Sequence, residues 1–282
     1  MTPDLQNLAP PSADVLIIAE RVNFGLASAP FDVGTLSEAK GQALSFVSDA
    51  WYQLSAETWV GLRLPLIAAS VRQPAGSYLD ESAWGNPELR FAKRFTLVQQ
   101  PSLMLRLTVG GGIGVPLAEH DPSLLPNRAL AIANALQGFA DPELFTPGEL
   151  PFTPFAQLDY GSGPFRALAL LKVPALFRVS DADLPEAQSN PHAFALMPVL
   201  ALEARYSLTR HFGVALASQL SLDALPPSEH IHSVPALQLM LRGSPYFELG
   251  QRGALFIDLQ APIAGALGGS TVALGVRAAL QF

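Results

Sequence analysis

The chain ends on Thr271-Val272-Ala273-Leu274-Gly275-Val276-Arg277-Ala278-Ala279-Leu280-Gln281-Phe282, and this stretch decides the fold class. Its even-numbered residues are apolar, whereas its odd-numbered residues are small or polar. Successive side chains of a β-strand point to opposite faces, so the alternation predicts a strand with one apolar and one polar face. About ten to twelve residues also suffice for a tilted strand to cross a bilayer. We therefore predict a strand between lipid and a polar lumen; an ordinary amphipathic strand is the alternative.

The composition excludes some classes of protein and favours others. Charged residues make up 15% of the 282 residues, below the usual figure of about 25%, while apolar residues make up an ordinary 49%. No run reaches about 18 uninterrupted apolar residues, so we expect no membrane-spanning helix. The absence of cysteine excludes disulfides, thiolate zinc sites and cysteine nucleophiles. One large all-β unit is the expected organisation.

The same alternation recurs along the chain and predicts twelve strands, at residues 15–27, 43–54, 58–71, 87–98, 102–115, 152–160, 164–179, 193–208, 211–222, 233–243, 253–263 and 270–282. Tight turns are expected at 55–57, 99–101, 161–163 and 209–210, with a longer one at 244–252. Between them lie long polar segments at 28–42, 72–86, 116–151, 180–192 and 223–232, and a short loop at 264–269. Short turns at one end and long loops at the other are typical of outer-membrane barrels.

We therefore predict an all-β fold, a transmembrane antiparallel up-and-down β-barrel of about 12 strands with both termini periplasmic. Residues 1–13 would form an N-terminal periplasmic extension and residues 14–282 the barrel. The aromatic Phe282 that closes the last strand resembles the C-terminal signature of bacterial outer-membrane β-barrels. This resemblance implies outer-membrane localisation and three partners, namely lipid, lipopolysaccharide and the barrel-assembly machinery. Residues 1–12 have no export leader, so we expect a mature form or a sequence missing its signal peptide.

A second resemblance covers about 50 residues. Trp84-Gly-Asn-Pro-Glu-Leu-Arg-Phe-Ala-Lys-Arg-Phe95, Leu103-Met-Leu-Arg-Leu-Thr-Val109 and Gly114-Val-Pro-Leu117 resemble the outer-membrane family of the MetA pathway of phenol degradation. In that family a Gly-Asp segment opens the descent from an outer loop, and this chain has Asn86-Pro87 where the family usually has Asp. The resemblance implies a porin-like channel for small, possibly aromatic, solutes.

Aromatic residues fit the barrel frame, because such barrels carry aromatic girdles at both membrane interfaces. We expect six of them near strand ends or on the lipid face, with core aromatics as the alternative: Trp51, Trp59, Trp84, Phe91, Phe95 and Tyr206. Lys93 falls on the lipid phase, so either it snorkels to a rim or a bulge shifts the register. Within the longest loop, residues 127–136 predict a short helix that covers the pore mouth or enters it.

The charges divide between strands and loops. Lys172 and ten arginines fall on the inward phase of the predicted strands: Arg21, Arg63, Arg90, Arg94, Arg106, Arg166, Arg178, Arg205, Arg242 and Arg277. The same phase carries five acids, which are Asp49, Glu88, Asp159, Glu203 and Asp258. The long loops hold fourteen acids, among them Asp141, Glu143, Glu149, Asp181, Asp183 and Glu186, against Lys40, Arg72 and Arg128. The prediction is a basic barrel wall below an acidic outer mouth.

Two interpretations of these charges stay open. A basic-lined conduit would favour anionic or carboxylated small-molecule solutes. Alternatively, the arginines pair with the acids and fill a narrow, closed barrel with a structural or interaction role.

Enzyme and metal sites are not expected. Glu229-His230-Ile231-His232 lies in a loop without a further ligand, and Gly110–Gly114 opens no helix, so it predicts a glycine-lined strand end. A lipid-modifying enzyme would need a Ser–His pair at the outer lipid boundary, whereas His211 and Ser207 fall at the periplasmic end. We therefore expect no catalytic residues, cofactor, metal or nucleic-acid partner, and a passive channel as the function.

Overall fold

The computed structural model describes residues 16–33, 36–72, 75–118, 129–130, 132–133, 136, 141–179, 194–222, 237–249, 253–264 and 272–281. Its elements are β1 (Leu16–Val33), β2 (Leu36–Gln53), β3 (Thr58–Arg72), β4 (Tyr78–Trp84), β5 (Glu88–Gln100), β6 (Leu103–Gly114), α2 (Pro142–Phe145), β7 (Glu149–Ser162), β8 (Phe165–Lys172), β9 (Ala175–Arg178), β10 (Phe194–Leu196), β11 (Val199–Ser207), β12 (Phe212–Leu222), β13 (Leu237–Glu248), β14 (Gly253–Ala264) and β15 (Val272–Gln281). Among the described residues, no helix is long and apolar enough to cross a membrane.

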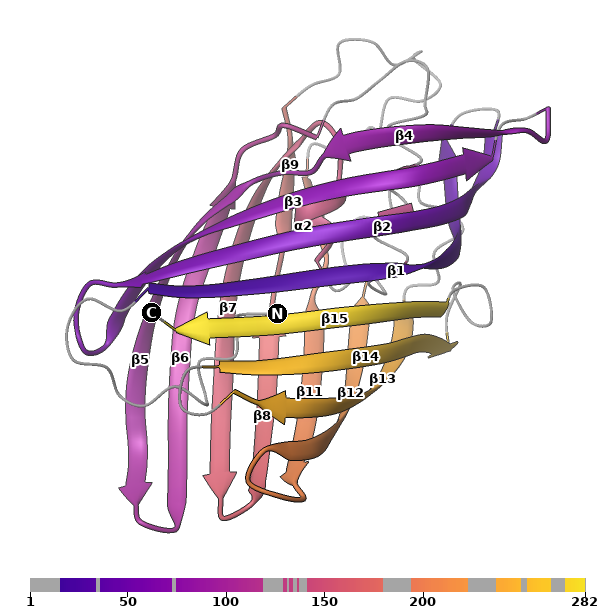
Figure 1. The fold of residues 1–282 in the computed structure, drawn as a ribbon. Helices are drawn as coiled ribbons and strands as arrows, with labels where there is room; N and C mark the ends of the chain where they lie inside the picture. The colour runs from indigo at the N-terminus through magenta and orange to yellow at the C-terminus, as the bar shows by residue number, and fades with distance from the viewer. Residues whose placement is uncertain are drawn as a thin grey trace.

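The strands close into a 12-strand antiparallel barrel, which confirms the predicted fold class. Sequential neighbours pair around the wall, and β1 closes it by pairing with β15, for example Arg21 with Arg277. In Figure 1 the strands nearest the viewer (β1, β2 and β15) cross the rear strands (β6 and β7) at a steep angle, as tilted barrel strands do. The start of β1 and the end of β15 lie together beside the β2–β3 turn.

Three strands of the barrel wall are each interrupted once, and two of these interruptions fall within predicted strands, 164–179 and 193–208. The interruptions separate β4 from β5, β8 from β9 and β10 from β11, and they contain Pro87, Pro174 and Pro198 respectively. Proline has no N–H to donate to a ladder, so these positions end one half of a strand and start the next. The wall stays continuous because β3 pairs with both β4 and β5, and β7 pairs with both β8 and β9.

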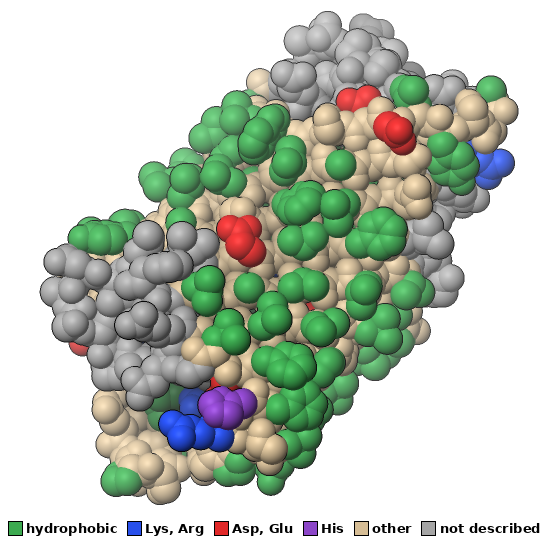
Figure 2. Space-filling model, in the orientation of Figure 1, with side chains coloured by type: hydrophobic (Ala, Val, Ile, Leu, Met, Phe, Trp, Pro, Cys, Tyr) green, Lys and Arg blue, Asp and Glu red, His purple; other side chains and the backbone are tan. Residues whose placement is uncertain are grey.

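The outside of the barrel is apolar. On β15, Leu274 is 53% exposed, whereas the neighbouring Ala273 is 1% exposed, as the alternation predicted. Hydrophobic side chains cover most of the face made by β1, β2, β3 and β15 in Figure 2. Glu20 is an exception on this outward phase, and its carboxylate accepts a 2.6 Å hydrogen bond from the Ser48 hydroxyl on the next strand.

Several predicted connections were too long. Residues 28–42 mostly continue the β1–β2 hairpin, since β1 runs to Val33 and β2 begins at Leu36. Residues 72–86 contain β4, and β13 extends to Glu248, which leaves only a short turn before β14. The predicted loops at 180–192 and 223–232, the N-terminal extension 1–13, most of the 264–269 loop and Phe282 lie outside the described residues.

The aromatic girdle was predicted correctly only in part. Phe91, Phe95, Trp84 and Tyr206 are exposed on the outside. The other two residues follow the core alternative: Trp51 and Trp59 lie near strand ends but are each 1% exposed and face inward, on the phase of the arginines that stack on them.

Lys93 stays on the outward phase, because the register shift in β5 comes after it, between Thr96 and Val98. Its ammonium lies 3.9 Å from the Glu57 carboxylate in the β2–β3 turn. Lys93 therefore reaches the short-turn rim, which is the snorkelling alternative.

Candidate functional site

A segment between β6 and β7 enters the lumen. We call its described residues (Ala118, Ala129, Leu130, Ile132, Ala133, Leu136 and 141–148) the plug. Residues 129, 130, 132, 133 and 136 are helical, as the sequence predicted, and their side chains are fully buried. They form one hydrophobic cluster with inward-facing residues of β2, β3 and β15: Ala43, Val47, Ile67, Ala69, Val71 and Ala273. Of the two predicted positions for this helix, the structure has the one inside the barrel.

One buried amide holds the second half of the plug to the wall. Asn86 lies at the break between β4 and β5, where its side-chain Nδ2 donates to the carbonyls of Glu143 (3.2 Å) and Thr146 (2.8 Å). Its Oδ1 accepts a 2.9 Å hydrogen bond from the Ala118 N–H. A carboxylate cannot donate, so an amide suits this position where the resembling family usually has Asp.

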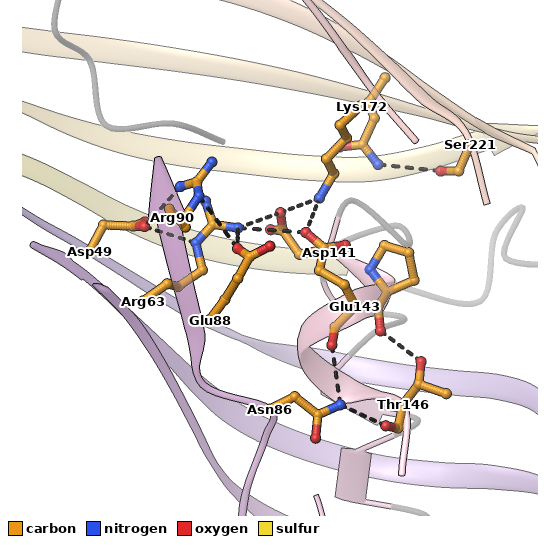
Figure 3. A network of polar contacts seen from close by, with 12 residues as sticks. Asp49, Arg63, Asn86, Glu88, Arg90, Asp141, Glu143, Thr146, Lys172 and Ser221 are labelled. Atoms are coloured by element: carbon orange, nitrogen blue, oxygen red, sulfur yellow. Dashed lines mark hydrogen bonds and ion pairs between the residues drawn. The ribbon is translucent and has the colours of Figure 1, made fainter. Parts of the chain in front are cut away.

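The plug carries two acids into the barrel, where they join six wall residues in the first ion cluster (Arg21, Asp49, Arg63, Glu88, Arg90, Asp141, Glu143 and Lys172). Figure 3 shows Asp141 and Glu143, just before and within α2, facing Lys172 and Arg63. Lys172 Nζ lies 2.6 Å from Asp141 and 2.5 Å from Glu143. Arg63 Nη1 lies 3.5 Å and 3.6 Å from the same two carboxylates, and Arg21 pairs with Asp141.

Arg63 is the centre of this cluster. It is 1% exposed and contacts four carboxylates, because its Nε also donates to Asp49 (2.8 Å) and its Nη1 lies 3.6 Å from Glu88. Arg90 bridges the same wall acids at 3.2 Å and 3.4 Å. Four basic side chains thus meet four acidic ones. Gly112 makes room for this arrangement, since a Cβ there would lie 2.0 Å from the Glu88 carboxylate.

The two plug acids respond differently to burial. Burial alone would raise the pKa of both carboxyls, since it disfavours the charged form. Arg21 and Lys172 nevertheless hold the pKa of Asp141 well below its usual range. The pKa of Glu143 is raised by burial and by the neighbouring Asp141, although Lys172 opposes the shift.

A second ion cluster (Glu203, Arg205, Arg242, Asp258 and Arg277) joins β11, β13, β14 and β15. Glu203 lies 2.5 Å from both Arg205 and Arg242, and Arg277 lies 2.6 Å from Asp258. The guanidinium groups of Arg205 and Arg277 also stack on Phe256, at 4.7 Å and 4.5 Å from the ring centroid. Three arginines here face two acids.

The remaining inward arginines lie toward the short-turn end, except for one. Arg94, Arg106 and Arg166 are half-buried near the ends of β5, β6 and β8, and Arg106 stands in register with Asp159 on β7. Arg178, in contrast, stands in register with Glu149 at the other end of β7. Arg90 therefore lies in the first ion cluster, whereas Arg94 lies with Arg106 and Arg166 toward the short-turn end.

The charge balance of the interior differs from the prediction. Asp141, Glu143 and Glu149 were assigned to an acidic outer mouth, but all three are buried inside. Among the described residues, eleven basic side chains therefore face eight acidic ones, the five predicted acids and these three. The assignment was wrong because Asp141 and Glu143 belong to a segment that folds inward, while Glu149 begins β7 on its inward phase.

One small cavity lies in the described part of the lumen. A cavity of about 50 Å³ lies between the two ion clusters, lined by Arg21, Asp49, Gln157, Glu203, Arg205 and Arg277 among others. A cavity needs roughly 10–15 Å³ to hold one water molecule, so this one admits only a few.

The weaker candidate sites gain no support. The Ser207 hydroxyl lies 2.9 Å from the Tyr246 hydroxyl, while His211 is exposed in the adjoining turn. In the part of the chain that the structure describes, no group of three metal-ligating side chains is found. Residues 229–232 lie outside that part.

Comparison with solved structures places the fold among known proteins. The COG4313 outer membrane channel from Pseudomonas putida F1 matches over 98% of both chains, with a TM-score of 0.63 and 13% sequence identity. The transport unit of the autotransporter AIDA-I from Escherichia coli matches over 94% of this chain and 89% of its own, with a TM-score of 0.54 and 9% identity. The chain has the fold of an outer-membrane β-barrel.

No family model and no curated protein matches the sequence.

Proposed function

We propose that the protein is an outer-membrane channel for passive diffusion of small solutes, and that the plug closes it at rest. The observation that carries the proposal is the interior of the barrel. A 12-strand wall encloses a lumen lined with ionisable side chains, and one inserted segment between β6 and β7 packs against the inner face of that wall. Barrels of this size are wider than the side-chain-filled eight-strand type.

A closed barrel with a structural or interaction role is the second candidate, and the 50 Å³ cavity favours it. Liposome swelling separates the two candidates. In a test variant, the plug region 119–147 is replaced by a short Gly-Ser turn. Proteoliposomes with this variant should swell in an uncharged pentose several-fold faster than those with the native chain. No swelling from the folded variant would favour the closed barrel.

For the open channel we propose a preference for anionic or carboxylated solutes. Without Asp141 and Glu143 the first ion cluster keeps four basic side chains against two acids. Near the short-turn end Arg94, Arg106 and Arg166 face Asp159. A pore's selectivity is set by the groups that line it, because charges more than about 8–10 Å away are screened by salt.

Neutralising this group should reverse the preference. In the variant without residues 119–147, the triple change Arg94→Gln, Arg106→Gln and Arg166→Gln should shift the reversal potential in a salt gradient toward cations. The matched control neutralises the loop acids Asp181, Asp183 and Glu186, which lie outside the described residues, and should shift it less. Cation preference before the change, or no response to it, would refute the proposed selectivity.

We also propose that the chain is assembled in the bacterial outer membrane through its last residue. Deleting Phe282 should reduce outer-membrane yield in cells far more than it reduces refolding in detergent, because recognition by the assembly machinery is separate from barrel stability. Quantifying folded protein in both settings tests this. An unchanged yield in cells would make the C-terminal signature a coincidence.

A further inference from the structure

The two plug acids occupy a basic site that belongs to the wall. Arg21 of β1, Arg63 of β3 and Lys172 of β8 approach Asp141 and Glu143 from separate strands. Both ion pairs of Lys172 in the described structure are made with the plug, at 2.5 Å and 2.6 Å. If the plug left the barrel, these three cations would face the lumen without the carboxylates of Asp141 and Glu143.

The contacts of the two carboxylates indicate which kind of solute could replace them at these cations. Each lies within hydrogen-bond distance of the same Lys172 Nζ, and each lies within 3.6 Å of Arg63 Nη1. A short aliphatic molecule with a carboxylate at each end presents the same two groups. Charge-assisted bonds between carboxylates and Arg or Lys are the strong ones, and they need no large apolar contact.

We propose that Arg21, Arg63 and Lys172 form a binding site for a dicarboxylate solute, and that Asp141 and Glu143 occupy it as a built-in competitor. The proposal rests on the channel function proposed above and names both the solute class and the opening step. In the closed conformation the plug acids occupy these cations, and in the open conformation the cations are accessible. A solute that binds them only in the open conformation shifts the equilibrium toward that conformation, by an amount set by its difference in affinity for the two. The solute would therefore open its own path.

The absence of cysteine allows a direct test with a single-cysteine reporter. Ala133 is fully buried in the plug, so a thiol in Ala133→Cys should react with a water-soluble maleimide only when the plug moves. Ala56→Cys, in the exposed β2–β3 turn, controls for the reagent itself. Succinate, the probe, should accelerate labelling at position 133 by about tenfold, which corresponds to about 1.4 kcal/mol. The uncharged analogue succinamide should have no effect.

Two wall variants in the Ala133→Cys background locate the effect. Lys172→Gln should raise the labelling rate without succinate and abolish the response to it, because it removes both ion pairs to the plug. Arg242→Gln neutralises a basic residue of the second ion cluster, whose ion pairs are with Glu203 and Asp258. It should preserve the acceleration by succinate, whatever it does to the labelling rate without succinate, because these ion pairs do not involve the plug.

The outcomes separate this inference from the channel itself. If Lys172→Gln loosens the plug but succinate does not accelerate labelling, or if succinamide acts equally, the dicarboxylate site is refuted while the channel proposal stands. If the barrel without residues 119–147 fails to pass solutes, the channel proposal fails, whatever the labelling shows. Succinate-dependent labelling that Lys172→Gln abolishes and Arg242→Gln preserves would support the site.

Discussion

Replacing Arg63 with methionine is expected to lower the free energy of unfolding by about 3–5 kcal/mol. The change leaves Asp49, Glu88 and the two plug acids without the cation that all four contact. Removing one partner from a buried ion cluster costs more than the pair itself contributes, because the remaining charges cannot be solvated. Chemical denaturation of the protein folded in liposomes measures the change.

The matched control is Lys93→Met. Lys93 and Glu57 form an exposed pair at 3.9 Å, so this change should cost less than about 1 kcal/mol. Equal small losses from both substitutions would show that water reaches the first ion cluster and that the plug does not seal it.

Arginine in place of Leu274 is expected to cost about 2–4 kcal/mol of folding free energy if this side chain lies at the bilayer midplane. The cause is the transfer of a cation into lipid, since Leu274 points outward from β15. The same reasoning applies to Leu200 and, with less exposure, to Leu105. Folding titrations into liposomes measure the loss.

The natural inward comparison, Gly275, is unsuitable because a Cβ there would lie 2.5 Å from Asn23 Oδ1. Gln219→Arg on the inward face of β12 is the better control, and it should cost less because the position already holds a polar side chain within the lumen. Equal penalties at Leu274 and Gln219 would contradict the assignment of the outer face to lipid.

The barrel could be predicted from the sequence because its signal is local and repeated. Each strand that separates an apolar surface from a polar lumen carries its own period of two, so the strand count was confirmed. The sequence did not predict how far β1, β2 and β13 extend. Where a strand continues beyond the lipid-facing band, its two faces no longer differ in polarity, and the alternation of apolar and polar residues is lost. The breaks at Pro174 and Pro198 left the alternation intact and were also missed.

The filling of the lumen could be predicted only in part. The short apolar helix near Leu130 was recognised, but its periodicity is the same whether it covers the mouth or enters the barrel. Asp141 and Glu143 lie in a polar loop in the sequence, and only the inward fold brings them to Lys172. The Asn86-Pro87 step was a usable signal, because an amide at a strand break offers donors that a neighbouring segment can accept.

Single-channel recording in planar bilayers tests most directly whether the plug closes a conducting lumen. The native chain should stay closed apart from brief openings, because the described part of the plug packs against the inner face of the wall and is held there by the first ion cluster. The variant without residues 119–147 should show long, uniform conductance steps in the same bilayer. Long conductance steps from the native chain, or none from the folded variant, would contradict the account.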